Sequence, residues 1–371
     1  MYIHPKGNPA SPVYVIVDKP LADDSTRGYL YSAPLGHTFD KMMQAAGFED
    51  YYVTCFRPDT DHLDSYRNII GELTQYCPPI IIPLGAAGNK LTKELEQKRR
   101  KKNYNPDEDS EINKYCGSLL TSPDLTYSHY ICPTIEPLDV VRQWKIRDII
   151  INCDLGRAKA ELDFWKTHGH LQPLPQRTHK IDFSCFDELL FDIDSMLVCS
   201  LISNDIETIY PKAPTKTQPS RFHKILPGYP VCTSFASSST FAISFDFFRE
   251  STIETRELWK HVAKLVWEVP SLGQNFFNFD ALFYRSLGMR IPLDKCKDTL
   301  ISHHILWPEF KHSLQFQTRQ YTREPYYKDE GHGWDGKNMK KLKIYNCKDT
   351  MVTYEIYDEH EKEFAERPHL R

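Results

Sequence analysis

Residues 196–208 have the sequence MLVCSLISNDIET, in which an apolar run leads directly to Asp205 and Glu207. We expect Met196 to Ile202 to form a buried strand that ends just before the two acids. Side chains two apart on a strand share a face, so both carboxylates would project together. Such a pair is relieved by a divalent cation, since hard cations prefer oxygen ligands. Taken alone, the pair is more typical of a solvated strand end.

The second acidic segment is GQNFFNFD at residues 273–280, which ends with Asp280. A carboxylate among three phenylalanines has little solvation unless it is paired or bound to a metal. The alternative is an N-cap Asp before a helix over 281–287, which would be a sufficient structural reason for the residue. Each phenylalanine of this segment is expected to pack in the core in preference to stacking on a base.

The third acidic segment is YNCKD at residues 345–349, which ends with Asp349 and is followed by apolar residues at helical spacing. Tyr345 and Asp349 are four residues apart, so they share one face of a helix. By itself this pattern equally describes a surface acid beside a core tyrosine. The order of the three acidic segments is therefore more informative than any one of them.

Together, DIE, NFFNFD and YNCKD resemble the three motifs of the DnaQ-like 3′→5′ exonucleases, in the subclass whose third motif is Tyr-x-x-x-Asp. The resemblance covers about residues 196–360 and includes proofreading domains of DNA polymerases. It implies an α/β, RNase H-like domain with a mixed sheet flanked by helices. It also implies two Mg²⁺ or Mn²⁺ ions, whose ligands would be Asp205, Glu207, Asp280 and Asp349. By the same resemblance, Tyr345 would orient the attacking water. The residues that would contact the substrate are Asn275, Phe279 and Thr208.

The N-terminal half has a different pattern. Short β-branched or apolar runs at Val13–Val17, Tyr51–Thr54 and Ile80–Pro83 predict strands, and amphipathic stretches between them predict helices over 37–46 and 63–76. Strands that alternate with helices indicate an α/β domain with a mostly parallel sheet. The charged residues of 97–115 and the Pro-rich, basic residues of 211–230 are expected to form loops.

Several segments of this half resemble the uracil-DNA glycosylase-like fold over about residues 12–160: VIVDKP at 15–20, VTCFRP at 53–58, IPLG at 82–85 and PTIEP at 133–137. The resemblance makes Asp18 the counterpart of the water-activating acid. It places Glu136 where the family has a histidine that stabilises the leaving base. A carboxylate repels the negative charge that develops there. We therefore expect an α/β/α domain with a degenerate glycosylase site and no base excision.

The whole chain of 371 residues is long enough for two domains, and we place their boundary between residues 170 and 171. With no export pattern and no apolar run that could cross a membrane, we expect a cytoplasmic protein, in the host cytoplasm if a phage encodes it. A net charge of −4 argues against tight, non-specific DNA binding by the chain alone.

The two domains in this order resemble the front half of certain bacteriophage family A DNA polymerases. We expect an exonuclease that removes nucleotides from single-stranded or frayed DNA 3′ ends, proofreading for a polymerase supplied as a separate subunit. That partner is expected because the chain stops soon after the third motif. The alternatives are an RNA-trimming nuclease of the same fold and a catalytically inert DNA-binding or scaffold subunit.

Overall fold

The computed structural model describes residues 3–32, 34–56, 62–88, 91, 115–137, 145–209, 229–331 and 338–370. The chain divides into two compact units, Met1–Leu174 with Arg323–Tyr326, and Pro175–Thr322 with Tyr327–Arg371. Each unit is an α/β structure around its own sheet. Of the loops predicted for 97–115 and 211–230, residues 97–114 and 211–228 lie outside the described residues. Tyr229 and Pro230 belong to a strand, so the second loop was predicted two residues too long.

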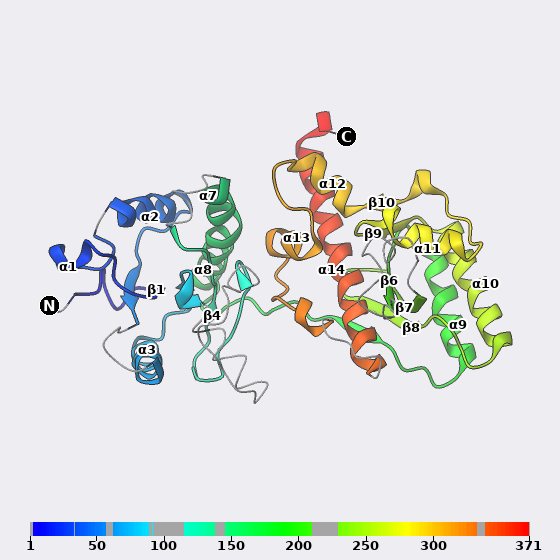
Figure 1. Ribbon diagram of the computed structural model, residues 1–371, viewed down its shortest axis with the longest axis horizontal. Coiled ribbons are helices and arrows are strands. Elements are labelled where there is room, and N and C mark those ends of the chain that lie inside the picture. Colours follow the sequence, from blue (N-terminus) through cyan, green and yellow to red (C-terminus); the bar gives the residue numbers. More distant parts are fainter. Residues whose placement is uncertain are drawn as a thin grey trace, which may run out of the picture. The chain divides into compact units, whose positions relative to one another are not determined.

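The first unit is built on a parallel sheet of four strands in the order β2-β1-β3-β4 (Figure 1). The strands are β1 (Val13–Val17), β2 (Tyr52–Cys55), β3 (Ile80–Pro83) and β4 (Tyr130–Ile131). Every residue of β1 is buried, as expected for a central parallel strand that is covered on both faces. The predictions for β1, β2 and β3 are confirmed to within one residue.

Helices cover both faces of this parallel sheet. They are α1 (Asp24–Arg27), α2 (Pro34–Ala45), α3 (His62–Tyr76), α7 (Lys145–Ile149), the π-helical turn η1 (Ile150–Leu155) and α8 (Gly156–His168). Alternate residues of β1 enter two cores: Val13, Val15 and Val17 pack with α2 and α8, while Tyr14 and Ile16 pack with α3. The strand periodicity of two therefore divides the apolar residues between the two faces.

The second unit contains a mixed sheet of six strands in the order β10-β9-β6-β7-β8-β5. The strands are β5 (Thr178–Lys180), β6 (Ile202–Ile209), β7 (Tyr229–Ala236), β8 (Phe241–Asp246), β9 (Ser271–Gly273) and β10 (Lys297–Asp298). Strand β6 is central: it runs antiparallel to β7 and parallel to β9. The mixed sheet expected for this half is confirmed.

Long helices lie on both faces of the mixed sheet. Helices α9 (Phe186–Ser195), α10 (Thr252–Glu268) and α11 (Asp280–Ser286) share a core with Ile202 and Ile206 of β6. Helix α14 (Met339–Glu366) packs against the other face, and α12 (Thr299–Leu306) and α13 (Leu314–Tyr321) lie beside it (Figure 1). Short helical turns complete the unit: η2 (Met196–Val198), η4 (Phe276–Asn278), η5 (Leu293–Lys295), η6 (Lys328–Glu330) and η7 (Pro368–Leu370).

The strand predicted for Met196 to Ile202 is wrong. Residues 196–198 form the turn η2 after α9, and Val198 is 91% exposed. The strand starts at Ile202, so Asp205 and Glu207 lie in its middle and not after its end. Ile202 and Ile206 on one face of β6 meet the apolar core, while Ser203, Asp205 and Glu207 lie on the other face. An apolar run was therefore the wrong signal for this strand.

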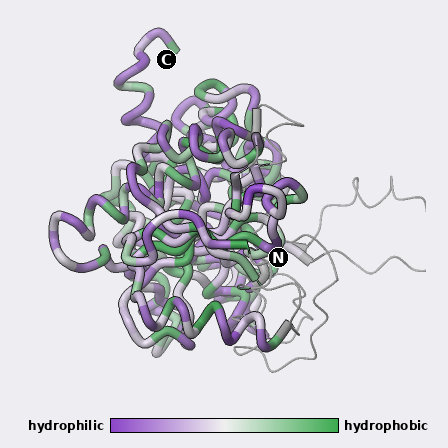
Figure 2. Tube along the Cα trace, turned by 90° about the vertical axis from the view of Figure 1, so that its left-hand side faces the viewer, coloured by the Kyte–Doolittle hydropathy of each residue, from purple (hydrophilic) through white to green (hydrophobic). Residues whose placement is uncertain are grey.

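Helix α14 has 28 residues and is the longest element described. Its charged side chains are distributed along its length, and the C-terminal end of the chain is largely hydrophilic in Figure 2. Among the residues that the structure describes, no helix combines the length and the apolar character required to cross a membrane.

Candidate functional site

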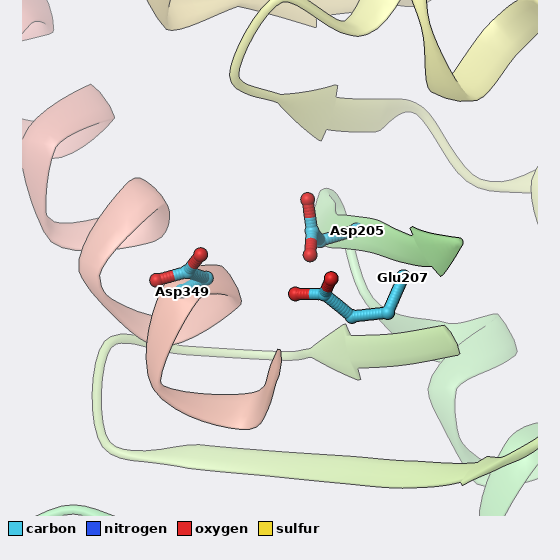
Figure 3. A group of neighbouring side chains, drawn as sticks. All are labelled: Asp205, Glu207 and Asp349. Atoms are coloured by element: carbon cyan, nitrogen blue, oxygen red, sulfur yellow. The ribbon is translucent and has the colours of Figure 1, made fainter. Parts of the chain in front are cut away.

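Three carboxylates meet between strand β6 and helix α14. Asp205 and Glu207 project from the same face of β6, and Asp349 projects toward them from α14 (Figure 3). One oxygen from each side chain lies within 4.8 Å of the other two. Asp205 and Glu207 are partly buried, and Asp349 is buried with 6% of its surface exposed.

Asp280 is fastened to the same strand. It is the first residue of α11, is 1% exposed, and its Oδ1 accepts a hydrogen bond of 2.9 Å from the backbone N–H of Ile206. The N-cap position belongs to Phe279, and no side chain caps the helix there. The N-cap alternative is therefore wrong. Asp280 lies close enough to Asp205 for each charge to oppose the other, but it is not part of the group of three.

Tyr345 and Asp349 are one turn apart on α14, and Lys328 of η6 contacts both. The Lys328 Nζ donates to Asp349 Oδ1 at 2.8 Å and Oδ2 at 2.7 Å, and to the Tyr345 hydroxyl at 3.0 Å. Tyr345 is 9% exposed. Lys328 was not predicted as a site residue, because no sequence motif connects it to the acids and only the fold brings it beside them.

Asn346 is a second residue that sequence reasoning missed. Its side chain is fully buried, and its Nδ2 donates to Asp205 Oδ2 at 2.6 Å. Its Oδ1 accepts from Ser244 Oγ at 3.1 Å. This hydrogen bonding orients Asp205 toward the other acids. Asn346 could have been predicted from its position in the third motif. It follows Tyr345 directly, so on a helix it lies next to the face that carries Tyr345 and Asp349.

Asn275 stands at the turn before η4 and has a left-handed backbone, with φ of +61°. Its backbone N–H donates to Asp298 Oδ1 at 2.9 Å, and the same oxygen accepts from Leu300 N as the cap of α12. Asp298 therefore joins the second acidic motif to the start of α12. The Asn275 side chain accepts from Asn278 at 3.1 Å.

The other two residues expected to contact substrate flank the acids. Phe279 is partly buried, and its ring meets that of Phe283 edge-on at 5.0 Å. Thr208 follows Glu207 at the point where the register between β6 and β7 shifts. Phe276 is fully buried in the core, as expected for the phenylalanines of this segment.

The electrostatics of the cluster follow from burial and like charge. Burial, with the Asp349 charge as the next cause, raises the pKa of Asp205 to about 7. Burial and the charges of Asp205 and Asp349 raise the pKa of Glu207 to about 9. The pKa of Asp280 is also raised, by burial first and then by Asp205. The ionised cluster is therefore unfavourable unless positive charge is added to it.

These residues fit a divalent metal. Carboxylate oxygens are the ligands that Mg²⁺ and Mn²⁺ prefer, and three carboxylates within 4.8 Å of one another can bind one ion together. A cation would also oppose the effects of burial and of like charge, which raise the pKa of Asp205 and Glu207. The type of ligand and the electrostatics of the cluster therefore both favour a divalent cation. Strand β6 already holds the Asp205 and Glu207 side chains on one face.

In the first unit, Asp18 and Glu136 both lie at the carboxyl edge of the parallel sheet. Asp18 follows β1 directly, and Glu136 follows β4 after a bridge between Leu84 and Thr134. Glu136 lies against Gly85, where a Cβ would come within 2.9 Å of the Glu136 Cβ. Burial, and then the Glu136 charge, raise the pKa of Tyr31. The roles of Asp18 and Glu136 remain predictions.

No protein-family model matches the chain, and no curated protein matches its sequence. Among solved structures, the catalytic core of RRP6 from Trypanosoma brucei is similar over 54% of this chain and 52% of its own length, with 14% identity and a TM-score of 0.41. The Nibbler EXO domain of Aedes aegypti is similar over 53% of this chain and 94% of its own, with 15% identity and a TM-score of 0.38. Brucella melitensis NrnC with bound Mg²⁺ is similar over 53% and 84%, with 14% identity and a TM-score of 0.35. The chain spans about half the length of the RRP6 core.

Proposed function

We propose that the second unit is a metal-dependent 3′→5′ exonuclease that removes nucleotides one at a time from single-stranded DNA ends. The observation that carries the proposal is the meeting of Asp205, Glu207 and Asp349 within 4.8 Å, from three positions that the sequence motifs had singled out. Asp280, the fourth motif acid, is hydrogen-bonded to the strand between the first two. An inert scaffold would have no use for a carboxylate cluster whose members repel one another.

When bound, two divalent ions would activate a water and stabilise the leaving 3′-oxygen. Asp205, Glu207 and Asp349 would hold them, with Asp280 as a further ligand or as the support of β6. Tyr345 would orient the attacking water. Burial and the Asp349 charge raise the pKa of Tyr345, so its hydroxyl keeps its proton at neutral pH and cannot serve as a general base.

The terminal nucleotide would lie against residues beside the acids. Thr208 follows Glu207 on β6, and Phe279 precedes Asp280. Asn275 is held by Asp298 at the opening of the same segment. Phe279 is partly exposed and could stack on a base, whereas the buried Phe276 could not. The biological setting we propose is proofreading of DNA for a polymerase.

The first unit would be a glycosylase-like domain that does not excise uracil. The support is Glu136, a carboxylate where a donor to a developing anion would be needed. Incubating the full chain with uracil-containing DNA should yield no abasic sites. Abasic sites that vanish in an Asp18→Asn variant would contradict this assignment.

Matched 5′-labelled single-stranded DNA and RNA oligonucleotides test the substrate. With Mg²⁺, the full chain should shorten the DNA stepwise from its 3′ end and do so faster than the RNA. Faster shortening of the RNA would make the enzyme an RNA-trimming nuclease of the same chemistry. Absence of shortening on both would contradict the proposal altogether.

A further inference from the structure

Lys328 places a positive charge inside the acidic cluster. Its ammonium lies 2.8 Å from Asp349 Oδ1 and 2.7 Å from Oδ2, so both oxygens of this carboxylate already have a cation. The two side chains are 16% and 9% exposed. A lysine this well covered is held in the site and does not sample the solvent as a surface lysine does.

The segment that carries Lys328 is itself held against α14. Glu330 Oε2 accepts from Lys348 Nζ at 3.0 Å. Gly331 lies so close to Tyr345 that a Cβ would come within 2.6 Å of the ring. The Lys328 ammonium also lies 5.1 Å from the centre of the Tyr345 ring. Contacts of Lys328 and of the following Glu330 and Gly331 therefore hold η6 against the third motif.

The Lys328 charge acts on the whole cluster. It opposes the effect of burial on the pKa of both Asp205 and Glu207, besides pairing with Asp349. Asp349 is the acid of the group that comes from α14, while the other two come from β6. The ammonium is thus placed asymmetrically, at the helix side of the cluster.

We propose that Lys328 is a built-in cation that competes with a divalent metal ion for Asp349. This rests on the proposed function and concerns how that site is loaded. An ion held by Asp205, Glu207 and Asp349 together would need an Asp349 oxygen, and it would have to approach that oxygen more closely than the ammonium does. Lys328 would therefore have to withdraw from Asp349 before the site is complete, and its side chain acts as a gate on metal loading.

Calorimetric titration of the full chain with Mn²⁺ tests the gate without any nuclease measurement. The Lys328→Gln variant should bind Mn²⁺ at least about tenfold more tightly than the unchanged chain, because the competing charge is gone. Lys343→Gln is the matched control: Lys343 is also on the α14 side of this unit, pairs with Asp246 at 3.4 Å and is 13% exposed. Its titration should match that of the unchanged chain.

Identical Mn²⁺ titrations for the unchanged chain and Lys328→Gln would overturn the gate. Weaker binding in Lys328→Gln would also overturn it, since Lys328 would then support the metal site. Absence of Mn²⁺ binding in every variant would overturn the gate and the proposed function together.

A second readout uses the unchanged chain and does not depend on the folding of a variant. Acetylation of each lysine by an amine-reactive reagent can be followed by mass spectrometry at increasing Mn²⁺. Acetylation of Lys328 should be slow without metal and rise severalfold as Mn²⁺ binds, while that of Lys343 stays constant. Lys328 that remains protected at saturating Mn²⁺ would overturn the proposal.

Discussion

The Oδ1 atom of Asp280 accepts a hydrogen bond of 2.9 Å from the backbone N–H of Ile206, the residue between Asp205 and Glu207. A buried contact therefore joins two acidic motifs that lie 73 residues apart in the sequence, counted from Glu207 to Asp280. Asp280 consequently has a structural task as well as its proposed chemical one. The two tasks can be separated by substitution.

Asp280→Asn should keep the fold and lose the nuclease activity, because the amide oxygen can still accept from Ile206 while the charge is removed. Asp280→Ala leaves that buried N–H without an acceptor, which should lower the free energy of unfolding by about 1–3 kcal/mol relative to Asp280→Asn. Urea unfolding in the presence of a chelator measures the difference. Equal stability of the two variants would show that the hydrogen bond has no structural role.

Asn346→Ala removes the donor that orients Asp205. Residues that orient metal ligands typically contribute 10–100-fold to metal affinity or activity, so we expect a loss of about that size in the nuclease rate at limiting Mg²⁺. Excess Mg²⁺ should restore part of it. Asn152→Ala, an exposed asparagine of the first unit, is the control and should leave the rate unchanged. A rate for Asn346→Ala equal to this control would contradict the orienting role.

The acidic cluster should make the free energy of unfolding depend on pH. Folding raises the pKa of Asp205 from 3.8 to about 7 and that of Glu207 from 4.5 to about 9. At pH values between the unfolded and the folded pKa of each acid, the folded chain binds protons that the unfolded chain has released. The free energy of unfolding therefore falls as pH rises. In a chelator, the melting temperature should therefore be lower at about pH 8.5 than at about pH 6.

Two comparisons isolate this effect from other titrations. The Asp205→Asn/Glu207→Gln double variant should show a smaller decline of melting temperature with pH. Added Mg²⁺ should stabilise the unchanged chain more at the higher pH, because its ligands bind it in the deprotonated form. A double variant with the same pH dependence as the unchanged chain would mean that burial and like charge do not raise the pKa of these two acids as inferred.

The sequence predicted three of the four strands of the first unit, because a buried parallel strand is apolar on both faces and leaves a clear run of residues such as VYVIV at 13–17. It gave no prediction for β4, which has only two residues. It misplaced β6, whose one polar face serves the site and whose composition is therefore unlike that of a core strand. The motif acids were visible from their spacing. Lys328 and Asn346 were not, because their roles arise from the packing of η6 and of α14.

Gly331→Ala should disturb the site without touching any acid. Gly331 has an ordinary backbone conformation, with φ of −87°, but a Cβ would lie within 2.6 Å of the Tyr345 ring. Either the ring or η6 must move, and displacements of this kind typically reduce rates by on the order of tenfold to a hundredfold. Gly71→Ala, where the Cβ meets nothing within 4 Å, is the control and should keep the full rate. Equal rates for the two variants would show that the Tyr345 contact is not needed.

The most direct test of the account is digestion of a 5′-labelled single-stranded DNA by the full chain and by its Asp205→Ala/Glu207→Ala double variant. With Mg²⁺ or Mn²⁺, the unchanged chain should produce a ladder that shortens from the 3′ end, and a chelator should abolish it. The double variant should retain its fold, shown by circular dichroism, and be slower by at least about a thousandfold, since the metal-held charge stabilisation is lost. Equal rates for the folded double variant and the unchanged chain would contradict the assignment of these acids.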